Sequence, residues 1–146
     1  MTQPIHILNG PNLNLLGTRE PDVYGTLSLK EIEQACAKHA GKLGYDIVFR
    51  QSNHEGELID WLHDANVNAS AVVFNPAAFT HTSVALHDAV RAIEPPVIEV
   101  HLSQTAAREP FRHHSYIALA ARGSITGFGL QSYLLGINAA ITSLGN

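Results

Sequence analysis

The chain has 146 residues, 45% hydrophobic and 15% charged, with a formal net charge of −4, which predicts a single globular domain over residues 1–146. The negative charge argues against nucleic-acid binding, because phosphates are bound by basic surfaces, and no apolar run approaches the ~20 residues of a membrane span. A signal-peptide pattern is absent and Cys36 is the only cysteine, which excludes an intrachain disulfide or a zinc–thiolate cluster and favours a cytoplasmic protein.

Short apolar runs alternate with segments of helical periodicity along the whole chain. The predicted strands are residues 4–8, 46–50, 71–74, 97–101 and 124–126. The predicted helices are residues 28–43, 52–66, 83–93 and a last helix after Gly129. This alternation predicts an α/β fold with a five-stranded parallel sheet and helices on both faces.

Local signals refine three of these elements. Ser28 with Glu31, and Ser52 with Glu55, each have the spacing of a capping box at the start of a helix. The loop at residues 9–27 is long for a compact domain, and long loops are usually functional. The last helix is apolar nearly all round, which predicts either a contact with another subunit or burial on several sides within one chain.

Ligands of open α/β sheets bind outside the carboxyl ends of the strands, so the residues expected there are the candidates for a site. They are mostly amides, imidazoles and guanidinium groups, a set that suits a small, oxygen-rich anion. The candidates are Asn9, Asn12, Asn14, Arg19, Tyr24, Asn75, His81, His101, Ser103, Arg108 and Arg112.

Three further observations narrow the chemistry. All three lysines fall on the first predicted helix, away from the strand ends, so Schiff-base catalysis is not expected. The nine histidines lack metal-ligand spacing, so no metal is predicted. Residues 127–132 partly match a dinucleotide-binding fingerprint but lack its third glycine and its acidic partner. We interpret them as a tight turn that lets the last helix pack closely.

Five motifs in chain order resemble those of type II 3-dehydroquinate dehydratases. The motifs are ILNGPNLN (7–14) with REP (19–21) and YG (24–25), QSNHEGELID (51–60), NP (75–76) with THTS (80–83), EVHLS (99–103), and RE (108–109) with FRH (111–113). The resemblance implies a flavodoxin-like three-layer fold and dehydration of 3-dehydroquinate to 3-dehydroshikimate, on the shikimate route to chorismate and aromatic amino acids. It also implies a reaction without cofactor or Schiff base, and a homododecamer built from trimers.

The resemblance further implies that the elimination proceeds through an enolate. Tyr24, as a tyrosinate, would remove the proton next to the ketone. A phenol has a pKa of ~10, so Arg19 and Arg108 would supply the positive charge that ionises it. Asn12 would hold a water that stabilises the enolate.

Protonation of the leaving hydroxyl and binding of the substrate are implied in the same way. His101 would protonate the departing hydroxyl, and Glu99, two residues earlier on the same strand face, would fix the imidazole and keep it protonated. The loop at residues 9–27 would close over the substrate as a lid. The substrate carboxylate would bind Asn75 and the backbone amides of Leu102 and Ser103, its hydroxyls would bind His81 and Arg112, and Asp88 would reach the site of a neighbouring subunit.

Several candidates also have ordinary structural interpretations. Tyr24 alone would be a surface aromatic, His101 a satisfied core histidine, and Asn12 and Asn75 turn residues after strands. The chain also departs from the family pattern without changing a proposed proton-transfer group. The departures are Pro76-Ala77-Ala78-Phe79, where glycine is frequent, Gln104 in place of asparagine, Pro110 in place of an acidic residue, and Ser132 in place of glycine.

Three alternatives compete with this function. A flavin- or nucleotide-binding module on the same fold needs a phosphate-binding loop after the first strand, where Pro11 removes a backbone donor. A non-catalytic assembly protein would tolerate the loss of Tyr24, Arg19 and His101, yet all three are present. An enzyme of the same fold acting on a related acid, such as quinate, is the third.

Overall fold

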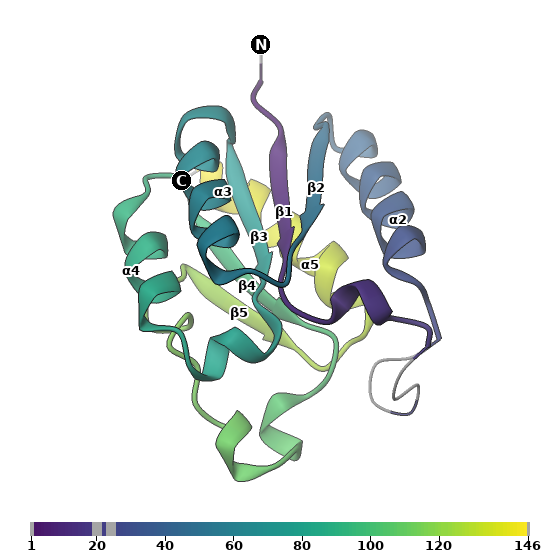
Figure 1. Ribbon diagram of the computed structural model, residues 1–146. Coiled ribbons are helices and arrows are strands. Elements are labelled where there is room, and N and C mark those ends of the chain that lie inside the picture. Colours follow the sequence, from purple (N-terminus) through teal and green to yellow (C-terminus); the bar gives the residue numbers. More distant parts are fainter. Residues whose placement is uncertain (1, 19–21, 23–25, 146) are drawn as a thin grey trace.

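The computed structural model describes residues 2–18, 22 and 26–145 of the chain (Figure 1). Within them, five parallel strands form one sheet in the order β2-β1-β3-β4-β5. This is the strand order of flavodoxin-like folds, in which the order reverses between β1 and β3. Each strand begins and ends within one residue of its predicted bounds. The strands are β1 (Ile5–Asn9), β2 (Ile47–Gln51), β3 (Ala71–Asn75), β4 (Val97–His101) and β5 (Gly123–Thr126).

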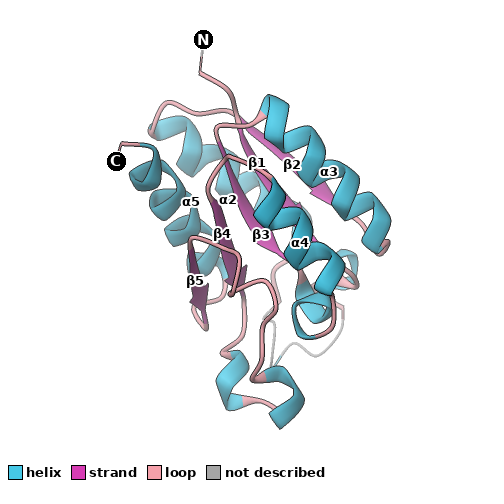
Figure 2. Ribbon diagram, turned by 90° about the vertical axis from the view of Figure 1, so that its left-hand side faces the viewer, coloured by secondary structure: helices cyan, strands magenta, loops and turns pink. Residues whose placement is uncertain are grey.

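Helices cover both faces of the sheet, which gives the three layers seen edge-on in Figure 2. Helices α2 (Leu29–Lys42) and α5 (Leu130–Leu144) pack on one face. Helices α3 (Glu55–Asn68) and α4 (Val84–Ala92) pack on the other. The predicted α/β fold with a parallel sheet is therefore confirmed.

Alternate residues of each strand enter the two apolar layers, as the period of two in a strand requires. Ile7 and Val73 pack toward α2 and α5, whereas Leu8 and Phe74 pack toward α3 and α4. All four side chains are fully buried. Burial on both faces explains why the central strands are continuous apolar runs, without alternation of polar residues.

One of the two predicted capping boxes is present. Ser28 Oγ accepts the Glu31 N–H at 3.2 Å, and Glu31 Oε1 accepts the Ser28 N–H at 3.2 Å. The second prediction is wrong, because α3 begins at Glu55 and Ser52 does not cap it. Ser52 Oγ instead accepts the N–H of His54 at 3.0 Å, within the turn before the helix. The Glu55 carboxylate accepts a hydrogen bond from Ser83, which ties the starts of α3 and α4 together.

Helix α5 packs closely against the sheet at Gly136. A Cβ at this position would lie 2.7 Å from Val100 Cγ1, so only glycine allows this packing distance. The predicted turn before α5 is present, with positive φ at Gly127 and Gly129. A Cβ built on Gly127 would lie 3.2 Å from Gln104 Cβ, so this turn is itself closely packed. Leu135 on α5 remains 41% exposed.

The loops that follow β1 and β3 are pressed together at the carboxyl edge of the sheet. Gly10 N–H donates to the Asn75 carbonyl at 2.8 Å. A Cβ on Gly10 would lie 2.3 Å from the Pro76 carbonyl oxygen, so a side chain cannot fit there. This contact places the segment that begins at Asn12 beside the end of β3.

Among the described helices, none has the length and apolar character needed to cross a membrane.

Candidate active site

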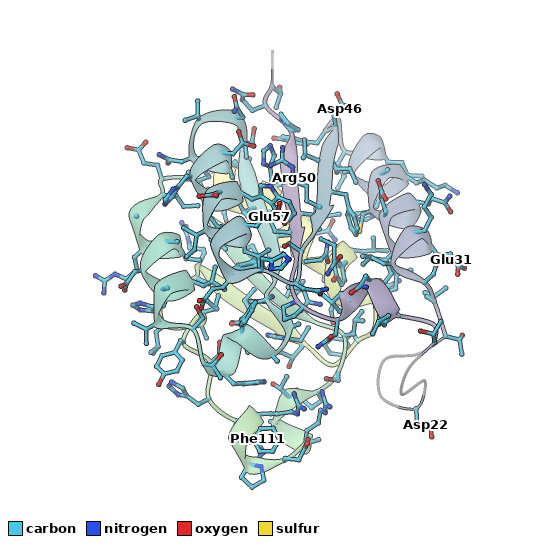
Figure 3. All side chains as sticks on the ribbon, in the orientation of Figure 1. Asp22, Glu31, Asp46, Arg50, Glu57 and Phe111 are labelled. Carbon is cyan, nitrogen blue, oxygen red and sulfur yellow. The ribbon has the colours of Figure 1, made fainter. Side chains whose placement is uncertain are left out.

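A cavity opens at the carboxyl ends of β1, β3 and β4, beside the point where the strand order reverses. Open α/β sheets bind their ligands at this position. The segment at residues 105–112 extends below the sheet in Figure 1 and contributes Thr105, Arg108 and Arg112 to the cavity lining. Phe111 lies at the outer end of this extension (Figure 3). The cavity is lined by Pro11, Asn12, Leu13, Asn75, Ala77, Ala78, His81, His101, Leu102, Ser103, Thr105, Arg108 and Arg112.

The structure brings together most of the catalytic and substrate-binding residues that were predicted from the sequence. Eight of them line the cavity, and Glu99 lies directly behind His101. Asp88 does not line this cavity; its side chain is 72% exposed on α4, where it accepts a hydrogen bond from His87. Arg19 and Tyr24 lie outside the described residues.

His101 and Glu99 form a buried pair at the end of β4. His101 Nε2 lies 2.6 Å from Glu99 Oε2, and the two side chains are 8% and 2% exposed. A carboxylate only accepts hydrogen bonds, so Nε2 carries the proton of this bond. The pair therefore leaves Nδ1 as the histidine nitrogen that can exchange a proton with a ligand.

The Glu99 carboxylate is surrounded by hydroxyl groups from three different segments. Thr80 Oγ1 donates to Oε2, Ser115 Oγ lies 2.9 Å from Oε2, and Ser124 Oγ donates to Oε1 at 3.2 Å. Burial opposes ionisation, but hydrogen bonds and charge from His101, with the hydroxyls of Thr80 and Ser115, hold the pKa of Glu99 below its ordinary value. Glu99 is therefore a carboxylate near neutral pH, placed to accept the Nε2–H of His101.

His81 presents a neutral imidazole to the cavity. Burial, together with charge from His101 and Arg112, lowers the pKa of His81 below its ordinary value, despite a hydrogen bond to the His114 carbonyl. His81 Nδ1 donates to that carbonyl at 2.8 Å. In the neutral ring Nε2 is then a lone-pair acceptor, suited to a ligand hydroxyl.

Two arginines give the cavity its positive charge. The exposed carboxylate of Glu109 lies 3.0 Å from Arg112 Nε and 3.8 Å from Arg108 Nε, so it orients both guanidinium groups. Arg112 also lies 5.0 Å from the centre of the Phe111 ring, and Arg108 donates to Ser103 Oγ at 3.4 Å. Two oriented guanidinium groups on one wall favour an anionic, hydroxyl-bearing ligand.

Asn12 is held at the cavity by its backbone. It has a positive φ of 69°, a conformation that asparagine tolerates better than most residues. Its N–H donates to Asn53 Oδ1 at 2.9 Å, and Gln51 Nε2 donates to the same oxygen at 3.1 Å. The side-chain amide of Asn12 makes no cap hydrogen bond, which leaves this amide available to a ligand.

The departure at residues 76–79 has a visible consequence at Ala77. Ala77 has a φ of +54°, a left-handed conformation that costs a non-glycine residue about 1–2 kcal/mol. Its N–H donates to Asn75 Oδ1 at 3.0 Å, so the turn that requires this conformation also fixes a side chain of the cavity. Ser132, another departure, is fully buried and accepts the Phe128 N–H at 3.0 Å, which stabilises the turn before α5.

Ala77→Gly is expected to raise the free energy of unfolding by about 0.5–1 kcal/mol. Glycine removes the left-handed penalty but loses about 0.5–1 kcal/mol more conformational entropy on folding. Urea unfolding would measure the difference. Ala78→Gly is the matched control, because Ala78 lies in the same short turn without positive φ and should lose stability. If the two variants change stability equally, Ala77 is not strained.

The residues that sequence reasoning missed are those that contact the candidates from behind. Thr80, Ser115 and Ser124 surround Glu99, and none carries a signal that separates it from an ordinary hydroxyl. Thr80 stands next to His81 within the motif THTS (80–83), and this position was the sequence signal that could have marked it as part of the site. Among the described residues, no group of three or more histidine, cysteine, aspartate or glutamate side chains is placed to hold a metal ion.

Comparisons with known proteins point in one direction. The sequence model of the family described as dehydroquinase class II matches residues 3–141. The chain is 94% identical over 146 residues to the 3-dehydroquinate dehydratase of Maricaulis maris, covering 100% of both chains. It is 57% identical over 140 residues to the 3-dehydroquinate dehydratase of Caulobacter vibrioides, covering 96% of both. A crystal structure of type II dehydroquinase from Propionibacterium acnes matches with a TM-score of 0.93 and 41% identity, over 97% of this chain and 98% of that chain.

Proposed function

The chain belongs to the dehydroquinase class II family and is a dehydratase of 3-dehydroquinate, and from this premise we propose how its cavity carries out the reaction. The observation that carries the proposal is the buried Glu99–His101 pair, with an ionised carboxylate, at the edge of a cavity with two arginines. The pair supplies a proton donor, His101, beside guanidinium groups that are suited to binding a polyol acid.

The substrate carboxylate binds at the ends of β3 and β4. Asn75 and the backbone amides of Leu102 and Ser103 are the donors for it, and all three residues line the cavity. The hydroxyls of the substrate bind the neutral His81 imidazole and the Arg112 guanidinium. This arrangement holds the ring in one orientation, so that the carbon next to the ketone meets the base.

Proton removal is assigned to Tyr24, acting as a tyrosinate, with Arg19 and Arg108 favouring its charged form. Arg108 lines the cavity, whereas the other two lie outside the described residues. The electrons of the broken C–H bond pass to the ketone oxygen and form an enolate. A water held by Asn12 donates a hydrogen bond to that oxygen.

The leaving hydroxyl departs from the neighbouring carbon as water. His101 donates a proton from Nδ1 while Glu99 keeps Nε2–H, and the enolate collapses to a conjugated enone. The proposed elimination is anti, which requires the base Tyr24 and the acid His101 to act on opposite faces of the ring. This scheme requires no cofactor and no Schiff base.

We further propose that residues 9–27 close over the bound substrate and that Asp88 serves the site of a neighbouring subunit in a trimer, four of which form a dodecamer. The exposure of Asp88 on α4, away from its own cavity, supports a role between subunits. The expected setting is the cytoplasm, on the route to chorismate.

Absorbance of the enone product tests the function. Purified protein treated with chelator and given 3-dehydroquinate should show a rapid rise in ultraviolet absorbance, because the substrate has no conjugated enone. No rise from folded protein would contradict the reaction. A yellow protein or a co-purifying nucleotide would instead support the flavin- or nucleotide-binding alternative, which the loop after β1 argues against through Pro11.

A further inference from the structure

A buried chain of hydrogen bonds lies behind Asn75, on the side of the sheet covered by α5. Tyr133 of α5 is fully buried, and its hydroxyl donates to Asn9 Oδ1 at 2.6 Å. The Tyr133 hydroxyl oxygen in turn accepts a hydrogen bond from Asn75 Nδ2 at 2.9 Å. Tyr133 therefore connects the last residue of β1 with the last residue of β3, directly below the cavity.

Backbone groups at both ends fix the direction of this chain. Asn9 Nδ2 donates to the Arg50 carbonyl at 2.9 Å, so the Asn9 amide can offer only its oxygen to Tyr133. The Tyr133 hydroxyl must then donate to Asn9 and accept from Asn75. At the other end Asn75 Oδ1 accepts the Ala77 N–H at 3.0 Å. Neither amide can rotate by 180° without placing like groups against each other.

The orientation of Asn75 matters because its amide lies on the cavity wall. The nitrogen carries two hydrogens, of which Tyr133 receives one. With the amide in this orientation the second N–H is available to an anion. In the reversed orientation the carbonyl oxygen would take the place of the nitrogen and repel a carboxylate.

We propose that Tyr133 is a positioning residue, which holds the Asn75 amide so that it donates to the substrate carboxylate. The inference rests on the proposed function, because it assigns the carboxylate to Asn75. Burial raises the pKa of Tyr133 well above its ordinary value, despite the hydrogen bond from Asn75, so the phenol keeps the proton that it donates to Asn9. The residue acts through Asn75 and does not touch the substrate.

A double-mutant cycle between Tyr133→Phe and Asn75→Ala tests this. Tyr133→Phe should raise KM about 5- to 30-fold and change kcat less than about threefold, because binding lost equally in ground and transition states appears in KM. In the Asn75→Ala background the same change should have no further effect on KM. An equal rise in KM in both backgrounds, or a loss confined to kcat, would overturn the proposal.

A binding measurement separates positioning from a general loosening of the core. Inhibition by quinate should weaken in Tyr133→Phe, whereas inhibition by a quinate analogue without the carboxylate should not change. Equal weakening of both would overturn the proposal. Tyr45→Phe is the control, because Tyr45 packs against the same apolar layer before the start of β2, and neither KM nor inhibition should change.

A second variant guards against a Tyr133→Phe protein that does not fold. Asn9→Ala removes the acceptor of the Tyr133 hydroxyl. The hydroxyl can then donate to Asn75 Oδ1 when the Asn75 amide rotates by 180°, so the orientation of that amide is no longer fixed. The KM should rise with kcat retained, again without additivity to Asn75→Ala. If the wild-type protein does not turn over 3-dehydroquinate, the proposed function is refuted. If the wild-type protein is active but the effects of these variants on KM add to that of Asn75→Ala, only this inference is refuted.

Discussion

His101→Ala is expected to lower kcat for enone formation by about 10²–10⁴-fold, the usual contribution of a general acid. The imidazole is the proposed donor to the departing hydroxyl, and hydroxide is a poor leaving group without a proton. Removal of the proton next to the ketone does not need this donor. In deuterated water the variant should therefore still exchange that proton, which nuclear magnetic resonance of the remaining substrate would detect.

The control for this variant is His63→Ala, an exposed histidine on α3 outside the cavity, which should keep wild-type turnover. If His101→Ala retains normal turnover, another group protonates the leaving hydroxyl. If it loses exchange together with elimination, proton removal and loss of hydroxide occur in one step, and the enolate is not an intermediate.

The role of His101 depends on the chemistry around Glu99. A carboxylate that is 2% exposed would normally favour its neutral form, because burial penalises charge. Hydroxyls from Thr80, Ser115 and Ser124 instead solvate it in place of water. The enzyme thus keeps a negative charge next to the imidazole without exposing either group, and the imidazole can carry the proton that the reaction needs.

The fold was predictable because its signals are local and repeated. The central strands β1 and β3 are mostly apolar, and burial between two helical layers explains why. The capping box at Ser52 failed for a reason that the same local pattern cannot reveal. The partner of Glu55 is Ser83, 28 residues away at the N-cap of α4, and only the packing of α3 against α4 brings them together.

The site residues at the strand ends could be predicted from the sequence, but the residues that contact them from behind could not. His101 and Asn75 end their strands, so the parallel sheet alone places them at one edge. Ser124 reaches Glu99 because the register of β4 and β5 pairs these two residues, and register is not readable from a four-residue strand. Tyr133 was hidden for the same kind of reason, since a buried aromatic on an apolar helix looks like core until its hydroxyl is placed.

Tyr24→Phe is expected to abolish both reactions that His101→Ala separates. Phenylalanine keeps the ring but has no oxygen to take a proton, so kcat should fall by at least about 10²–10⁴-fold. Deuterium exchange next to the ketone should disappear as well, because no enolate forms.

Tyr116→Phe is the matched control for the base. Tyr116 follows Arg108 and Arg112 in the chain and does not line the cavity. Removal of its hydroxyl should therefore leave turnover and exchange intact. A Tyr24→Phe protein that still exchanges would move the base to another residue of the cavity, and the neutral His81 imidazole, which already has a free lone pair, would be the next group to replace.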